Sequence, residues 1–311
     1  MSRQQVPNYE LQTDTARLNL LTNGGMDVWQ RGNGPFTSNY AADRWVIGLS
    51  GTDTISVSRD SANADVANGS FYCAACTFTL GTGGGNSVFY QVLKTTADLN
   101  QFRGRTISFS VRVRTSTANA VRAFISSDGT GNVTQTSSFH TGSGAYQTLT
   151  VTNTIPADAN AGANAGVFLA ASCTAYLDNA MLVVGSVPAD YAPLHPADDL
   201  ARCLRYYEVD SGTSVPIGTA QAYGTGAFQV MVRFRAIKAV VPTVTVSAVS
   251  DFGVMNATGG ANLTVTGFTP GAIQATGFGA NGTVASGLTA GNATNMVGVT
   301  GNAKVMVEAN P

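Results

Sequence analysis

The chain has 311 residues, enough for two domains with separate hydrophobic cores, and its formal net charge is −1. Charged residues make up 11% and hydrophobic residues 44%, a balance that excludes a disordered chain and leaves no basic face for nucleic acid. The 35 glycines and many Thr- and Val-rich segments indicate an all-β protein with many turns. Because so little charge keeps copies apart, we expect partners or further copies to cover much of the surface.

The first 19 residues are polar, lack periodicity and contain Pro7 in an extended context. They predict an N-terminal arm that is either disordered or ordered by packing on a neighbour. Residues 1–10 lack the apolar core of a secretory signal, and no run of eighteen apolar residues occurs in the chain. We therefore expect neither secretion by a signal peptide nor membrane insertion.

Residues 20–187 predict one domain of short strands separated by turns. The most regular strand is 106–114, where Ile107, Phe109 and Val111 point one way and polar residues the other. We expect residues 121–126 to pair with it. About eight to ten strands in this region favour a sandwich or barrel. The remaining predicted strands are 52–58, 71–80, 87–93, 146–151, 166–170 and 174–184.

Residues 188–208 predict a linker with a short helix. Pro188, Pro193 and Pro196 fall within nine residues and impose an extended, semi-rigid connection. Residues 197–208 then predict a helix running into a strand, with acidic residues in the first turn and arginines in the last.

Residues 209–311 predict a smaller C-terminal β domain of about four to six strands. The segments 228–234 and 241–247 alternate as strands do, and 303–309 is another short strand. The chain is nearly free of charge after Asp251, and the glycine-rich run 271–301 is interpreted as irregular loop.

Three segments carry a family resemblance. The first is Asn-Leu-Leu-Thr-Asn-Gly-Gly-Met-Asp-Val-Trp-Gln-Arg-Gly at 19–32, followed by Ala-Asp-Arg-Trp at 42–45. The second is Ala-Tyr-Leu-Asp-Asn-Ala-Met-Leu-Val-Val-Gly at 175–185. The third is Leu-Ala-Arg-Cys-Leu-Arg-Tyr-Tyr at 200–207 with Val-Val-Pro-Thr-Val at 240–244. In this order they resemble bacteriophage virion fibre or appendage proteins that contain a jelly roll similar to carbohydrate-binding modules.

The resemblance implies an all-β architecture of a docking arm at 1–19, a jelly roll at 20–187, the linker and helix at 188–208, and the C-terminal domain at 209–311. It further implies that Arg3, Pro7, Tyr9 and Leu11 dock the arm onto the tail or capsid. A homotrimer is the usual expectation for such fibres. The expected location is the virion, assembled in the host cytoplasm, with other virion proteins and host surface glycan as partners.

The same resemblance implies a structural calcium ion between the first and last strands, held by Asp178 and by carbonyls near Gly25. The alternative is that Asp178 accepts hydrogen bonds from the adjoining loop. No other cofactor is expected. Five side chains of the opening segments are interpreted as its core signature: Trp29, Arg31, Asp43, Arg44 and Trp45.

The two tryptophans admit two interpretations. Exposed rings would stack on a sugar, whereas buried rings would pack in the sandwich with the indole N–H satisfied. The second is favoured, because both lie in the opening segments and not in a variable loop. Arg31 and Arg44 would then cap or stack beside them, and Asp43 would be a buried hydrogen-bond or ion-pair partner.

No arrangement of residues predicts catalysis. His140 and His195 are interpreted as exposed loop residues, with neither metal spacing nor a nucleophile motif. Cys73 and Cys76 form a Cys-x-x-Cys within a strand, which sends them to opposite faces, and small buried thiols are the simplest interpretation of all four cysteines. The acidic residues cluster in loops and do not form the carboxylate pair that glycoside hydrolysis requires.

The sequence therefore predicts a phage virion structural protein that is not an enzyme, most simply a tail fibre or tail appendage that binds host surface glycan. A capsid decoration or head fibre protein is the first alternative, and a polysaccharide-degrading tail enzyme is the second.

Overall fold

The computed structural model describes residues 18–94, 100–131, 134–255, 260 and 262–311. The predicted docking residues Arg3, Pro7, Tyr9 and Leu11 lie outside this part of the chain. The described chain is an all-β protein with one short α-helix, and none of its helices has the length and apolar character that crossing a bilayer requires.

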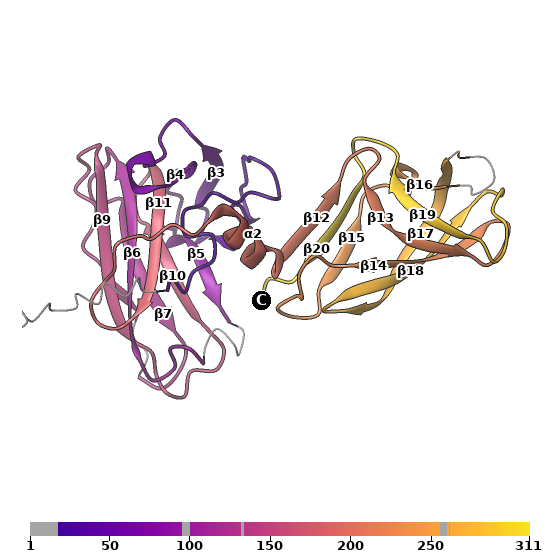
Figure 1. Cartoon of the computed structure of the whole chain (residues 1–311). Coiled ribbons are helices and arrows are strands. Elements are labelled where there is room, and N and C mark those ends of the chain that lie inside the picture. The colour runs from indigo at the N-terminus through magenta and orange to yellow at the C-terminus, as the bar shows by residue number, and fades with distance from the viewer. Residues whose placement is uncertain (1–17, 95–99, 132–133, 256–259, 261) are drawn as a thin grey trace, which may run out of the picture.

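The first domain is a jelly-roll-like sandwich of two antiparallel sheets (Figure 1). The six-stranded sheet has the order β1-β2-β5-β10-β7-β8, and the five-stranded sheet has the order β3-β4-β11-β6-β9. A 3-10 turn, η1 (Val66–Asn68), follows β3. The strands are β1 (Asn39–Tyr40), β2 (Trp45–Gly48), β3 (Thr54–Asp60), β4 (Cys73–Thr79), β5 (Ser87–Leu93), β6 (Thr106–Thr115), β7 (Val121–Ser127), β8 (Gln135–Thr136), β9 (Tyr146–Thr154), β10 (Ala163–Leu169) and β11 (Cys173–Val184).

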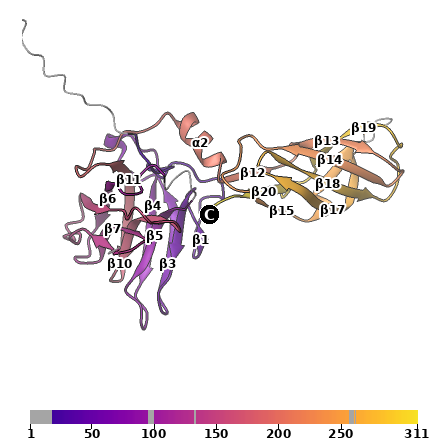
Figure 2. The same cartoon turned by 90° about the horizontal axis from the view of Figure 1, so that it is seen from below.

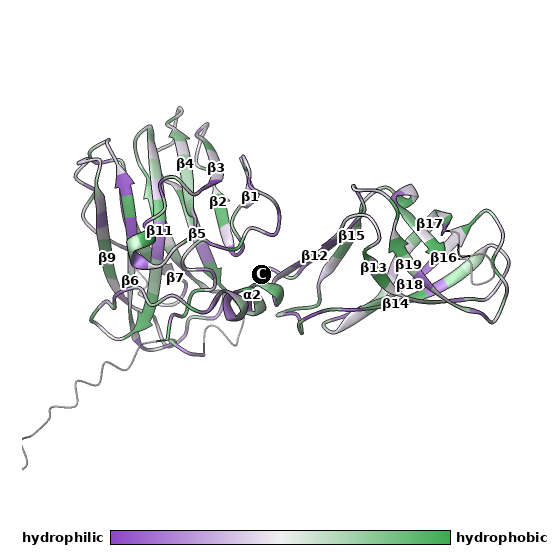
Figure 3. Ribbon diagram, turned by 45° about the horizontal axis from the view of Figure 1, so that its top comes forward, coloured by the Kyte–Doolittle hydropathy of each residue, from purple (hydrophilic) through white to green (hydrophobic). Residues whose placement is uncertain are grey.

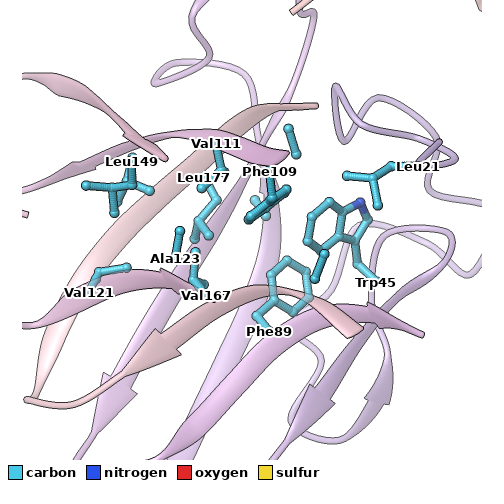
Figure 4. Packing of buried hydrophobic residues seen from close by; sticks show 14 of the residues in the cluster. Leu21, Trp45, Phe89, Phe109, Val111, Val121, Ala123, Leu149, Val167 and Leu177 are labelled. Carbon is cyan, nitrogen blue, oxygen red and sulfur yellow. The ribbon is translucent and has the colours of Figure 1, made fainter. Parts of the chain in front are cut away.

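The core lies between the two sheets, where alternate residues of each strand point inward (Figure 4). Phe109 and Leu177 of the five-stranded sheet meet Phe89 and Val167 of the six-stranded sheet, and all four are buried. Colouring by hydropathy shows the same alternation of apolar and polar residues along the strands (Figure 3).

The predicted pairing of 121–126 with 106–114 is wrong. β7 pairs with β10 and β8, whereas β6 pairs with β9 and β11. The chain crosses from one sheet to the other between β6 and β7, so these strands face each other across the core. Two consecutive alternating strands can form a hairpin or oppose each other in a sandwich, and the alternation itself does not distinguish the two.

The second domain follows the helix α2 (Pro196–Leu204). A three-stranded sheet of order β12-β20-β15 leads into a closed barrel of order β13-β14-β18-β17-β16-β19. A 3-10 turn, η2 (Val249–Asp251), precedes β16. The strands are β12 (Tyr207–Ser211), β13 (Pro216–Ala222), β14 (Ala227–Arg233), β15 (Thr243–Val246), β16 (Phe252–Met255), β17 (Asn262–Gln274), β18 (Gly277–Val284), β19 (Ala293–Gly298) and β20 (Lys304–Glu308).

The interpretation of residues 271–301 as irregular loop is wrong, because β18, β19 and the end of β17 lie there. The glycines make room inside a narrow barrel. A Cβ added at Gly282 would lie 2.1 Å from the ring of Phe228, which is itself fully buried. Glycine in these strands therefore marks close packing of a large ring and not a loop.

The two domains lie end to end, with α2 and the three-stranded sheet between the sandwich and the barrel (Figure 2). β12 begins at Tyr207, within the segment that the sequence placed in the linker, because its backbone pairs with β20 of the second domain.

Candidate functional site

The outer face of the six-stranded sheet carries the candidate site. On β5, β10 and β7 the inward residues form the core, and the intervening residues point away from it. The strand registers place Tyr90 beside Gly166 and Gly166 beside Phe124. We call the outer surface of these three strands the β5–β10–β7 face. Its outward side chains are Val88, Tyr90, Val92, Arg122, Phe124, Ser126, Asn164 and Phe168.

Aromatic rings occupy the middle of this face. The ring centroids of Tyr90 and Phe124 lie 6.2 Å apart, and those of Phe124 and Phe168 lie 4.3 Å apart. Gly166 lies between the first two, where an added Cβ would come within 2.4 Å of the Tyr90 Cβ. Phe124 is buried, while Tyr90 and Phe168 are half-buried and still offer ring surface to a ligand.

A hollow of about 460 Å³ adjoins Tyr90, the one of these three aromatic residues that lines it. Tyr90, Lys94, Ser126 and Asn164 contribute to its lining, and the Asn164 amide donates to the Ser126 hydroxyl over 3.3 Å. Asp128 also lines it, but its carboxylate accepts from the backbone N–H groups of residues 160–162 over 2.8–3.1 Å. These bonds lower the pKa of Asp128 and hold the loop that forms one wall.

The chemistry of this face is that of a binding surface. Half-buried rings offer apolar area, and amide, hydroxyl and ammonium groups beside them offer donors and acceptors. Burial raises the pKa of Tyr90, so its phenol stays protonated and can both donate and accept.

This face was not predicted from the sequence. Its one usable signal is the alternation in β5 and β10, where Tyr90 and Phe168 occupy positions that should face solvent. A large ring at an outward position is common on protein surfaces, so it becomes informative only when three strands bring several rings together.

The core signature residues divide between two places. Trp45 is fully buried and stacks on Phe89 with 5.3 Å between centroids, and its indole N–H donates to the Asn23 carbonyl over 2.8 Å. The Trp29 indole is also buried and donates to the Met26 carbonyl over 2.6 Å. Neither ring is available to stack on a sugar.

The side chains of Arg31 and Arg44 extend from the sandwich and contact residues at the start and end of the second domain. The guanidinium carbon of Arg31 lies 3.6 Å from the Tyr207 ring centroid, and its terminal nitrogen contacts the Glu308 carboxylate. Arg44 is buried and lies 3.8 Å from the ring centroid of Tyr206. We call these five residues, with Asn310, the junction cluster.

Hydrogen bonds reinforce the junction cluster. The Arg44 guanidinium donates to the Asn310 side chain over 2.9 Å and to the Val92 carbonyl over 2.6 Å. The Gln30 amide donates to the Tyr207 carbonyl over 3.0 Å. The opening segment thus joins the two domains, a role that its position in the sequence did not indicate.

Asp43 is fully buried behind the junction cluster. It accepts from the Gln30 backbone N–H over 3.0 Å and lies 3.8 Å from the Arg31 guanidinium. Burial raises the pKa of Asp43 to about 6, although these two partners oppose the shift.

Both carboxylate oxygens of Asp178 accept hydrogen bonds, as the alternative interpretation of this residue expects. Its two carboxylate oxygens accept backbone N–H groups, from Asp65 over 2.8 Å and from Asn179 over 2.8 Å. The carboxylate of Asp27, which is close enough to influence it, accepts from two further backbone N–H groups. The described residues contain no group of three His, Cys, Asp or Glu able to hold a metal, whereas calcium takes six to eight oxygen ligands.

The histidines lie in different environments from one another. His140 is fully buried, so its interpretation as an exposed loop residue is wrong: its Nδ1 accepts from the Gly142 N–H over 2.9 Å and its Nε2 lies 3.2 Å from the Ala145 carbonyl. Both ring nitrogens of His140 therefore have a backbone partner within this buried turn. His195 is exposed and accepts from the Ala197 N–H at the start of α2.

All four cysteines are free and buried. Burial raises the pKa of Cys73 to about 12 and that of Cys173 to about 11, which leaves both thiols protonated and unreactive at neutral pH.

The chain matches no known family profile and no curated protein. Among solved structures it is similar to a CBM4 domain (22% identity, 52% of this chain, 98% of that chain, TM-score 0.35). It is also similar to the enzymatically active domain of tailspike protein 4 of bacteriophage CBA120, with 13% identity over 54% of this chain and 21% of that chain and a TM-score of 0.37. A cyclase of Fischerella sp. TAU is similar with 12% identity over 55% of this chain and 100% of that chain and a TM-score of 0.38. At such identities and TM-scores, the activities of these proteins carry no weight for this chain.

Proposed function

We propose that this chain is a structural subunit of a phage particle, a tail fibre or tail appendage, and that its sandwich domain binds a glycan on the host surface. The β5–β10–β7 face is the observation that carries the glycan-binding part. A pyranose presents an apolar face and a rim of hydroxyl groups, which match the half-buried rings of Tyr90 and Phe168 and the polar groups around the hollow.

The virion role rests on the three sequence segments that resemble phage fibre and appendage proteins. The end-to-end arrangement of the two domains suits an appendage, because a rigid elongated subunit holds a binding face away from its attachment point (Figure 2). On this proposal the chain binds and does not catalyse, and residues 1–19 attach it to the particle.

Tyr90→Ala tests the glycan site. Loss of the ring should weaken binding of the purified chain to host cells or to its glycan on an array by about tenfold, which corresponds to ~1.4 kcal/mol. Tyr223→Ala is the matched control, since Tyr223 is 59% exposed on the second domain. Equal binding by wild type and Tyr90→Ala, with unchanged thermal unfolding, would contradict this site.

Deletion of residues 1–18 tests the virion role. The shortened chain should fold, as judged by its circular dichroism and unfolding temperature, and should be absent from purified particles by mass spectrometry. Normal incorporation would contradict docking by the arm, and absence of the full-length chain from particles would contradict the virion role itself.

A further inference from the structure

Arg122 lies at one end of the β5–β10–β7 face without an acidic partner. It points outward from β7, next to Phe168 of β10 in the strand register. Its guanidinium carbon lies 5.4 Å from the Phe168 ring centroid and 5.0 Å from that of Phe139. Within the described chain no carboxylate forms an ion pair with it, and its buried Nε has no hydrogen-bond partner.

Two other partly buried guanidinium groups have an acidic partner, whereas the buried Arg44 donates to an amide side chain and a backbone carbonyl. Arg31 lies against Asp43, and Arg112 lies 2.7 Å from the Asp65 carboxylate. Buried polar groups in folded proteins nearly always have a hydrogen-bond partner. The Nε of Arg44 and of Arg103 is likewise buried without a partner, so the Arg122 Nε does not by itself mark a site. The feature that suits an anionic ligand is a half-buried guanidinium on this face with no carboxylate partner in the described chain.

The two phenyl rings prepare Arg122 for such a partner. They pack against the guanidinium by cation–π contacts, which leave its charge uncompensated by an acid. A planar guanidinium with free N–H groups matches the two oxygens of a carboxylate or phosphate.

A second cation lies at the opposite end of the face. Lys94 is exposed, follows β5 directly and lines the hollow. The row of residues across the sheet that contains Arg122 lies six residues along the strands from the row that contains Lys94. This separation is about 20 Å. Asp128 is the one acidic side chain that lines the hollow, and three backbone N–H groups engage its carboxylate; the last residue, Pro311, also lines the hollow. Positive charge therefore marks both ends of a face in a chain that carries little charge.

We infer that the glycan bound on the β5–β10–β7 face is acidic, and that a sugar carboxylate or phosphate binds Arg122 beside Phe139 and Phe168. This inference rests on the proposed function and assigns the ligand class of the same site. The neighbouring sugar would stack on the Tyr90 ring, and Lys94 would attract a second anionic group farther along the chain of sugars.

The test uses an array in which every acidic bacterial oligosaccharide stands beside its carboxyl-reduced or dephosphorylated form. The full-length wild type should bind the acidic member of a pair at least about tenfold more tightly, and added salt should weaken this preference. Arg122→Gln should bind both members equally. Arg122→Lys should keep part of the preference, because it retains the charge and loses the planar fork.

Arg233→Gln, at an exposed position of the barrel, should keep the full preference. Thermal unfolding of each variant shows whether the fold is intact. Equal binding of acidic and neutral members by wild type, or an unchanged preference in folded Arg122→Gln, would overturn this inference while leaving glycan binding in place. Failure of folded wild type to bind any member would overturn the proposed function and this inference together. The carboxyl-reduced and dephosphorylated pairs show which anion Arg122 binds.

Discussion

Two buried carboxylates make the stability of this chain depend on pH. Burial raises the pKa of Asp178 to about 7 and that of Asp43 to about 6, from an ordinary value of 3.8. Both folded values lie above the unfolded one, so the folded chain holds these protons between about pH 4 and the raised values. The stability that this contributes is fully present below about pH 4 and is lost progressively as the pH rises to the folded values of about 6 and 7.

Asp178→Asn should reduce this pH dependence. Wild type should unfold at a lower temperature at pH 8 than at pH 5, and the variant should show a smaller difference, since its side chain does not ionise. The contribution is on the order of a few kcal/mol, and each kcal/mol moves the midpoint by about 2–4 °C for domains of 150–250 residues.

Scanning calorimetry at the two pH values measures the effect, with the exposed Asp190→Asn as control. Calcium added to wild type at pH 8 should leave the midpoint unchanged, because both Asp178 oxygens already accept N–H groups. A calcium-dependent rise that Asp178→Asn abolishes would restore the calcium site that the resemblance implied.

At the scale of elements, a buried ion pair connects the segment between β14 and β15 to β12, and the same lysine contacts the end of α2. The Lys238 ammonium contacts the Glu208 carboxylate over 2.5 Å and donates to the Leu204 carbonyl over 2.5 Å, and both charged side chains are buried. Burial lowers the pKa of Lys238, and the Glu208 partner opposes this shift. Arg235 also donates to Glu208, so the carboxylate has two cationic partners and the ammonium has one anionic partner.

This asymmetry predicts unequal effects of removing each partner. Glu208→Gln leaves the buried Lys238 ammonium without its acidic partner and should destabilise the chain by about 3 kcal/mol. Lys238→Met leaves Glu208 paired with Arg235 and should cost less. Chemical denaturation of both variants and of the double variant measures the coupling. Lys304→Met, at an exposed position, should change stability by less than about 0.5 kcal/mol. An equal or reversed order of the two single variants would contradict this arrangement.

Periodicity predicted the strands of the sandwich well and their pairing poorly. Residues 106–114 and 174–184 fall within β6 and β11, because alternate burial leaves a period of two in the sequence. The barrel strands after Gly271 were not predicted, because glycine interrupts that period wherever a ring such as Phe228 needs room.

For the whole molecule, the junction cluster supplies contacts between the two domains. Arg44→Met removes a ring contact and leaves the Asn310 side chain and Val92 carbonyl without this donor. The radius of gyration from small-angle X-ray scattering should rise and the scattering should indicate flexible domains, while each domain stays folded. Arg59→Met, which removes a guanidinium 4.1 Å from the Tyr72 ring centroid within the first domain, is the control. Identical scattering from both variants would show that other contacts hold the junction.

Self-association is the second expectation at this scale. Residues 252–303 contain no charged side chain, so copies of the barrel can approach without repulsion. We expect light scattering to give three times the chain mass at every concentration tested. A concentration-independent monomer would contradict the homotrimer and favour a subunit that assembles only on the particle.

The sequence by itself determined the all-β class, the helix after the prolines and the segments of the sandwich, since these follow from alternation, turn residues and capping within short stretches of chain. It also marked the opening segments as important. Only the tertiary structure showed that Arg31 and Arg44 join the domains and that Tyr90, Phe168 and Arg122 share one face. Those residues come from segments far apart in the chain, and strand register, which local patterns do not encode, decides which of them meet.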